Sequence, residues 1–139
     1  MINRKITITA RILLIIYLAA IGYICFGTFN RIPQICRLFL GIDSDKVVHF
    51  LMFLPFPFLL YFSRNRELTS PGKTMLFSIA VFIVGCFIAA GTEMIQTAVP
   101  GRNGDRLDFL ADAIGLGLGA ICILIIDLTR HFRRCSKES

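Results

Sequence analysis

Residues 107–126 read LDFLADAIGLGLGAICILII, twenty residues whose only charged side chains are Asp108 and Asp112. About 20 predominantly apolar residues are what an α-helix needs to cross the hydrocarbon core of a bilayer. A charged side chain at the bilayer centre costs roughly 2.5–3.5 kcal/mol on insertion scales, so acids in such segments are rare and functional by default. The stretch therefore predicts a transmembrane helix that carries part of a polar site.

Three other apolar segments of the chain approach the same length. The whole sequence is 55% hydrophobic and 17% charged, with a mean hydropathy of +0.72, whereas soluble domains are about 25% charged. The apolar runs are continuous and lack the alternation of a membrane β-barrel. The prediction is an all-α membrane protein, a four-helix transmembrane bundle forming one domain over residues 1–139, with helices at about 10–29, 46–63, 74–97 and 106–128.

The distribution of Lys and Arg predicts the orientation of the bundle. Ten of the fifteen lie at the N-terminus, between the second and third predicted helices, or in the C-terminal tail. Cytoplasmic loops carry an excess of these residues, so both termini are expected in the cytoplasm, N-in/C-in. Asp127, close to Arg130 and Arg133 at that end, is expected to form a solvated ion pair. The net charge of +6 then reflects topology and contact with anionic lipid, with no nucleic-acid partner.

Proline residues predict a kink in the second helix. Pro55 and Pro57 lack backbone donors and clash with the carbonyl group four residues earlier. We therefore expect the helix to bend near Leu51 to Phe53, just below His49.

Polar residues open the second helix and close the third. Asp45 and His49 are spaced i, i+4 and so share one helix face, where the carboxylate favours the imidazolium and can orient the ring. Glu93 and Gln96 share a face at the end of the third helix. All four residues are expected at the outer end of the bundle, at the same depth.

The fourth helix contributes a stripe made of Asp108, Asp112, Gly115 and Gly119. The Gly115-x-x-x-Gly119 pair allows a neighbouring helix backbone to approach closely, as in many membrane helix pairs. The acids and the glycines are therefore expected to face the interior of the bundle together.

Two interpretations of the acids stay open at this stage. Arg102 and Arg106 lie within reach of Glu93, Asp108 and Asp112, so the acids could be members of structural ion pairs. Alternatively, three helices supply unlike polar groups to a functional polar cavity.

A metal centre is not expected from the sequence. The donors of Asp45, His49, Glu93 and Asp112 suit magnesium, manganese or zinc. No compact HExxH or CxxC motif accompanies them, and the arginines compete for the carboxylates. Cofactors cannot be assigned from these residues.

Short motifs at these positions resemble the VanZ-like family, named for a membrane protein of glycopeptide-resistance clusters. The family's D-K-x-x-H-F, E-x-x-Q and P-G-R-x-x-D/S-x-x-D-x-x-x-N-x-x-G elements match in order over about 75 residues. The matching residues are Asp45, Lys46, His49, Phe50, Glu93, Gln96, Pro100, Gly101, Arg102, Asp105, Asp108 and Gly115. Asp112 departs from the pattern, because the family usually has Asn there. The resemblance implies a small multi-pass protein of the bacterial cytoplasmic (inner) membrane, with a founding member linked to low-level teicoplanin resistance.

The favoured function is that of a non-catalytic factor that binds or modulates a cell-envelope component. Its partners would be membrane lipids or lipid-linked envelope precursors. The candidate binding residues are Lys46, Gln96, Arg102, Arg106 and Asp112.

The alternative is a membrane enzyme that hydrolyses or transfers a lipid-linked anionic headgroup. His49 would be the general acid or base, oriented by Asp45, with Glu93 or Asp108 as the second carboxylate. Arg102 and Arg106 would hold the anion. Proton-linked transport is less favoured, because four helices leave little room for alternating access.

Overall fold

The computed structural model describes residues 4–26, 44–64, 70–98 and 105–138. These ranges contain helices and no strand. The helices are α1 (Arg4–Phe26), α2 (Ser44–Phe53), α3 (Pro55–Phe62), α4 (Pro71–Gln96) and α5 (Arg106–Glu138). Taken together, α2 and α3 form one crossing, so the described chain has four helical elements long and apolar enough to span a membrane. The predicted all-α, four-helix membrane fold is confirmed.

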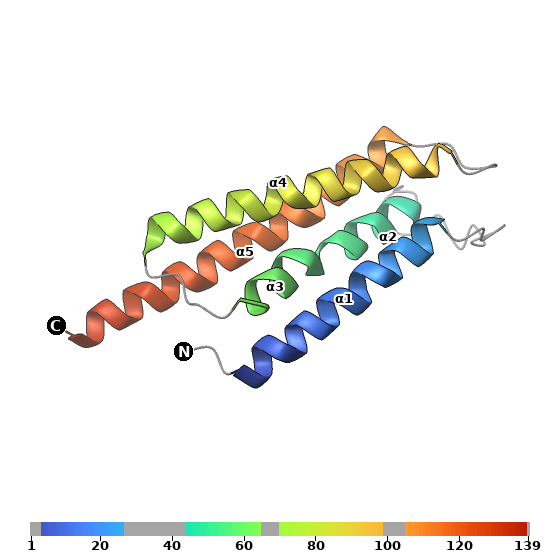
Figure 1. Ribbon diagram of the computed structural model, residues 1–139. Coiled ribbons are helices and arrows are strands. Elements are labelled where there is room, and N and C mark those ends of the chain that lie inside the picture. The colour runs from blue at the N-terminus through green and yellow to red at the C-terminus, as the bar shows by residue number, and fades with distance from the viewer. Residues whose placement is uncertain (1–3, 27–43, 65–69, 99–104, 139) are drawn as a thin grey trace.

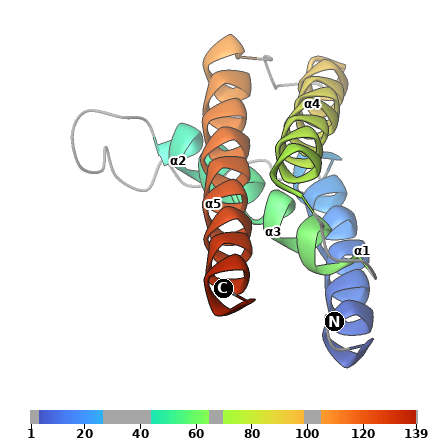
Figure 2. The same cartoon turned by 90° about the vertical axis from the view of Figure 1, so that its left-hand side faces the viewer.

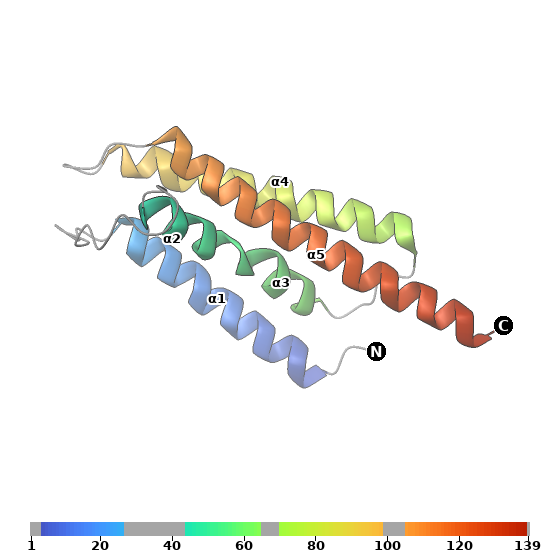
Figure 3. The same ribbon diagram turned by 180° about the vertical axis from the view of Figure 1, so that it is seen from behind.

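The helices form a bundle in which α4 and α5 run antiparallel, side by side (Figure 1). The α2–α3 element packs on α5, and α1 packs on α3 and α4. Figures 2 and 3 show α1 and α5 on opposite sides of α3. Helix α1 begins and α5 ends at the same end of the bundle (Figure 1). An N-in/C-in chain requires this arrangement, and the side of the membrane on which that end lies stays a prediction.

The first and last helices, α1 and α5, are longer than their apolar runs suggest. Helix α1 begins at Arg4 rather than near residue 10, and α5 continues to Glu138 rather than ending near residue 128. Hydropathy marks the part of a helix that lies in hydrocarbon, whereas the backbone hydrogen bonds can continue into water. The charged residues Arg, Lys and Glu at these ends are good helix formers.

The second crossing is interrupted at Leu54, between the end of α2 and the start of α3 at Pro55 and one residue beyond the bend predicted near Leu51 to Phe53. Pro55 has no N–H group to donate to the preceding turn. The Leu54 N–H still donates to the Phe50 carbonyl oxygen at 3.0 Å, so the two pieces remain one crossing element.

Helix α5 lies directly against this break through its glycines. A Cβ atom on Gly115 would lie 2.5 Å from the Phe50 carbonyl oxygen, and one on Gly119 would lie 2.8 Å from the Leu54 carbonyl oxygen. Side chains would prevent so close a backbone approach. The close packing predicted for the Gly115-x-x-x-Gly119 pair is confirmed.

Side-chain to backbone hydrogen bonds attach α1 to the α2–α3 element. The Tyr17 hydroxyl donates to the Met52 carbonyl oxygen, two residues before Leu54. At the other end of α1, Arg11 Nε donates to the Ser63 carbonyl oxygen at 3.0 Å. Large apolar side chains such as Ile15 and Phe87 are exposed on the outside of the bundle, as a lipid-facing surface requires.

Candidate functional site

Helix α2 begins, α4 ends and α5 begins at the end of the bundle opposite the chain termini (Figure 1). A buried histidine of α2 lies among side chains of these three helices. His49 of α2 is 4% exposed. Its Nδ1 atom is 3.1 Å from Asp112 Oδ1 of α5 and 3.8 Å from Glu93 Oε1 of α4. Its Nε2 atom is 4.0 Å from Asp108 Oδ2 of α5. One imidazole therefore contacts three carboxylates from two other helices; we call these four residues the His49 cluster.

The carboxylates of α5 in this cluster are almost completely removed from solvent. Asp112 is 0% exposed and Asp108 is 5% exposed. Among the described residues, Asp112 Oδ2 and Asp108 Oδ1 have no hydrogen-bond partner. A buried polar atom without a partner costs free energy, about 1–3 kcal/mol for a neutral group and more for a charged one. Within the described residues, the burial of these two carboxylate oxygens is therefore not offset by hydrogen bonds.

Lys46 forms the rim of the cluster. Its Nζ atom is 3.4 Å from Asp105 Oδ2 and 3.9 Å from Asp108 Oδ1. Asp105 also caps α5, because its Oδ1 atom accepts a hydrogen bond from the Leu107 backbone N–H at 2.9 Å. That backbone hydrogen bond, followed by Lys46, holds the pKa of Asp105 below its ordinary value.

The orienting carboxylate differs from the expected one. The i, i+4 spacing suggested that Asp45 holds His49, and Asp45 is exposed, with a ligand oxygen within 4.8 Å of His49 and Asp108. The hydrogen-bonding partner of His49 Nδ1 is Asp112. Helix spacing describes neighbours on one helix, whereas this contact depends on how α5 packs against α2.

The other predicted site residues differ in their placement. Gln96 is buried on the same face of α4 as Ala89 and Gly85. Arg106 is exposed at the start of α5. Arg102 lies outside the described residues. The roles suggested for all of these residues stay predictions.

The structure contains a second polar contact, at the opposite end of the bundle, that was not predicted from the sequence. Asp127 is half-buried and accepts hydrogen bonds from the Tyr61 hydroxyl and the Thr74 hydroxyl, both at 2.5 Å. Arg130 donates to the Tyr61 hydroxyl at 3.4 Å. The expectation of a solvated ion pair was therefore wrong, because packing brings α3 and α4 onto the Asp127 carboxylate. The position of Asp127 directly after the apolar pair Ile125-Ile126 was the available signal.

An apolar groove of about 360 Å³ runs between α2 and α5, beside the His49 cluster. Its lining consists of Lys46, Val47, Phe50, Leu107, Leu110, Ala111 and Ile114. Val47, Leu110 and Ile114 are between 40% and 56% exposed, so the groove opens on the lipid-facing side of the bundle. Lys46 is the charged member of this lining and also belongs to the rim of the cluster.

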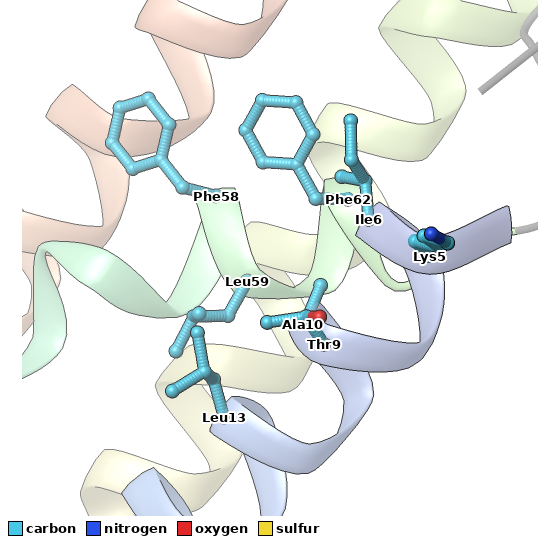
Figure 4. Close-up of a pocket in the computed structure, with 8 residues that line it drawn as sticks. All are labelled: Lys5, Ile6, Thr9, Ala10, Leu13, Phe58, Leu59 and Phe62. Atoms are coloured by element: carbon cyan, nitrogen blue, oxygen red, sulfur yellow. The ribbon is translucent and has the colours of Figure 1, made fainter. Parts of the chain in front are cut away.

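A second groove of about 360 Å³ lies between α1 and α3, near the other end of the bundle (Figure 4). It is lined by Lys5, Ile6, Thr9, Ala10, Leu13, Phe58, Leu59 and Phe62. None of these residues belongs to the His49 cluster. The groove beside Lys46 is therefore the one that adjoins the candidate site.

Comparison with known proteins identifies the family. The sequence model of the VanZ/LLP1 family matches residues 6–127, which include all four helical crossings and the His49 cluster. The chain belongs to the VanZ/LLP1 family. No solved structure matches this VanZ/LLP1 protein.

A curated relative comes from a eukaryote. An uncharacterized protein of Schizosaccharomyces pombe is 30% identical over 94 residues, which are 68% of this chain and 52% of the relative. The chain thus spans about half the length of that relative. Because this relative is a fission yeast protein, the envelope and resistance roles suggested for this VanZ/LLP1 chain stay predictions.

Proposed function

We propose that this VanZ/LLP1 protein binds an anionic lipid-linked molecule of the cell envelope at the end of the bundle that carries the His49 cluster. The observation that supports this function is the apolar groove with Lys46 at its rim. A hydrocarbon chain would lie along Val47, Leu110 and Ile114, and the anionic headgroup would pair with the Lys46 ammonium. Such binding would change how the envelope component is displayed, which is one route to altered glycopeptide resistance.

The selectivity of this site would come from the headgroup. Lipid tails are as apolar as the groove walls, so moving a chain from bilayer to groove has no hydrophobic driving force. Lys46 is half-buried and already lies near Asp105 and Asp108. An incoming anion would compete with these carboxylates for the ammonium, at a depth where water screens charges poorly.

The proposal includes an orientation. The described residues Arg11, Lys73, Arg130 and Arg133 belong to the end where α1 begins and α5 ends. By the positive-inside rule this end faces the cytoplasm, and the His49 cluster faces the outer leaflet. The proposed location is the bacterial cytoplasmic membrane.

A second candidate function is supported by the hydrogen bond between His49 and Asp112. A carboxylate bound to Nδ1 selects one orientation of an imidazole, which a general acid or base needs. The other ring nitrogen, Nε2, is 4.0 Å from Asp108 Oδ2. The corresponding activity is hydrolysis or transfer of the anionic headgroup, with His49 moving the proton.

Lipid retention separates the binding function from non-specific contact. The purified chain would be placed in nanodiscs that contain equal amounts of phosphatidylcholine and a polyprenyl phosphate, and the lipids retained after detergent extraction would be measured by mass spectrometry. We expect enrichment of the polyprenyl phosphate, reduced at least fivefold by Lys46→Ala. Lys73→Ala, an exposed lysine at the other end of the bundle, is the matched control and should retain the enrichment. Equal retention of both lipids by the unmodified chain would refute binding.

Release of inorganic phosphate from the same nanodiscs tests the enzymatic candidate. Release that is lost in His49→Ala and kept in His131→Ala would establish it. No release above empty nanodiscs would leave binding as the function.

A further inference from the structure

We infer that His49, Glu93 and Asp112 form a binding site for a divalent transition-metal ion. Each residue offers one ligand atom, and the three atoms lie within 4.8 Å of one another. They come from three different helices, α2, α4 and α5. A metal site was not expected from the sequence, because these residues form no compact ligand motif. The packing of the three helices brings their ligand atoms close together.

The distances suit ligands that share one ion. Nitrogen and oxygen ligands bind zinc at roughly 2.0–2.2 Å, so two ligand atoms on one ion lie about 3–4 Å apart. His49 Nδ1 is 3.1 Å from Asp112 Oδ1 and 3.8 Å from Glu93 Oε1. Both distances fall in this range. The ligand atoms of Glu93 and Asp112 lie within 4.8 Å of each other, so we expect side-chain rotations to bring all three ligands onto one ion.

An unpartnered buried oxygen is the independent sign of a ligand. Asp112 is 0% exposed, and its Oδ2 atom has no hydrogen-bond partner among the described residues. Buried carboxylates are paired with a cation, or coordinate a metal, in nearly all proteins. His49 contacts Oδ1 and leaves Oδ2 unmatched. A cation bound at the Asp112 carboxylate would offset the burial of this oxygen.

The second nitrogen of His49 has a carboxylate nearby. A histidine that binds a metal through one ring nitrogen almost always donates the other N–H to a carboxylate, carbonyl or water. With the metal on Nδ1, the carboxylate available to His49 Nε2 would be that of Asp108, whose Oδ2 atom is 4.0 Å away and would have to move closer to accept a hydrogen bond. Asp108 would then be an orienting residue outside the ligand set.

The charges of these residues also call for a cation. Glu93, Asp108 and Asp112 bring three negative charges, and Lys46 brings one positive charge. Lys46 also pairs with Asp105, at the shorter distance of 3.4 Å. The acids at the cluster therefore outnumber its basic groups, which favours a bound cation.

The donor set also restricts the choice of ion. One imidazole with two carboxylates suits manganese, iron or zinc, whereas calcium takes six to eight oxygen ligands. Three protein ligands leave at least one position open. An anionic headgroup could bind at such an open position. The metal site does not depend on the proposed lipid-binding function.

Manganese titration tests the site directly. The full chain, purified in detergent and stripped with a chelator, would be titrated with Mn²⁺ while the electron paramagnetic resonance signal of free Mn²⁺ is recorded. We expect one Mn²⁺ bound per chain, displaced by Zn²⁺ and unaffected by an equal concentration of Ca²⁺. Glu93→Gln and Asp112→Asn should weaken the affinity at least tenfold. Asp127→Asn alters a carboxylate at the far end of α5 and should retain binding.

Folding of each variant is measured separately, so that loss of Mn²⁺ binding can be attributed to the missing ligand and not to unfolding. Glu93→Gln preserves shape at a partly exposed position, and its elution volume and melting temperature without metal should match those of the unmodified chain. Absence of Mn²⁺ binding by the unmodified chain would overturn the inference, as would equal affinity in folded Glu93→Gln. Lipid retention measured in chelator distinguishes failure of this site from failure of the proposed function.

Discussion

Gly115 of α5 lies against the carbonyl oxygen of Phe50 in α2, so closely that a Cβ atom at position 115 would be 2.5 Å from that oxygen. Phe50 follows His49, and Gly115 lies one turn after Asp112. The backbone contact therefore sets the separation of α2 and α5 at the level of the His49 cluster. It allows His49 Nδ1 to come within 3.1 Å of Asp112 Oδ1.

Gly115→Ala should destabilise the bundle, because a backbone carbonyl cannot move aside as a flexible side chain can. We expect a loss of about 1–3 kcal/mol, the usual range for overpacking, measured as reduced resistance to unfolding in detergent. Gly117→Ala is the matched control: its Cβ atom would meet Phe82 Cε2 at an ordinary 3.5 Å. Equal effects of the two substitutions would contradict the close α2–α5 contact.

Tyr61→Phe should destabilise the other end of the bundle by removing the hydroxyl that donates to Asp127. Hydrogen bonds to charged groups contribute about 1.5–3 kcal/mol. A double-mutant cycle with Asp127→Asn isolates the contact, since Tyr61→Phe should cost much less once the carboxylate is gone. Additive losses would show that the two side chains act independently.

Asp105 should contribute stability that depends on pH. Its pKa is lowered below the ordinary value of 3.8 in the folded protein, so its ionised form is favoured by folding. The contribution is fully present above the unfolded value and is lost as the pH falls through 3.8 and below. Asp105→Ala should therefore lower the melting temperature at pH 7, and the difference from the unmodified chain should shrink at pH 3. A difference that stays constant between these pH values would exclude the charge as its source.

The two ends of α4 should be labelled from opposite sides of the membrane. In a background without native cysteines, Thr97→Cys should react with a membrane-impermeant maleimide added to intact cells, and Lys73→Cys should react only after the cells are opened. Both residues are exposed in the structure. Labelling of position 73 in intact cells would invert the proposed orientation.

The sequence by itself determined the class of fold, the four crossings and the residues on the buried stripe of α5. These features are local: the length of an apolar run measures a span, helical spacing assigns a face, and Pro55 breaks a helix wherever the helix lies. Asp108, Asp112, Gly115 and Gly119 are all buried on α5, as their spacing predicted.

Only the tertiary structure decided which stripes meet, and at what depth. Helical spacing suggested Asp45 as the partner of His49, whereas the packing of α2 against α5 supplies Asp112. The packing of α3 and α4 against α5 likewise brings the hydroxyl groups of Tyr61 and Thr74 to Asp127. The physical reason is that periodicity describes a helix in isolation, while the rotation and axial shift between neighbouring helices depend on close contacts such as that of Gly115 with Phe50.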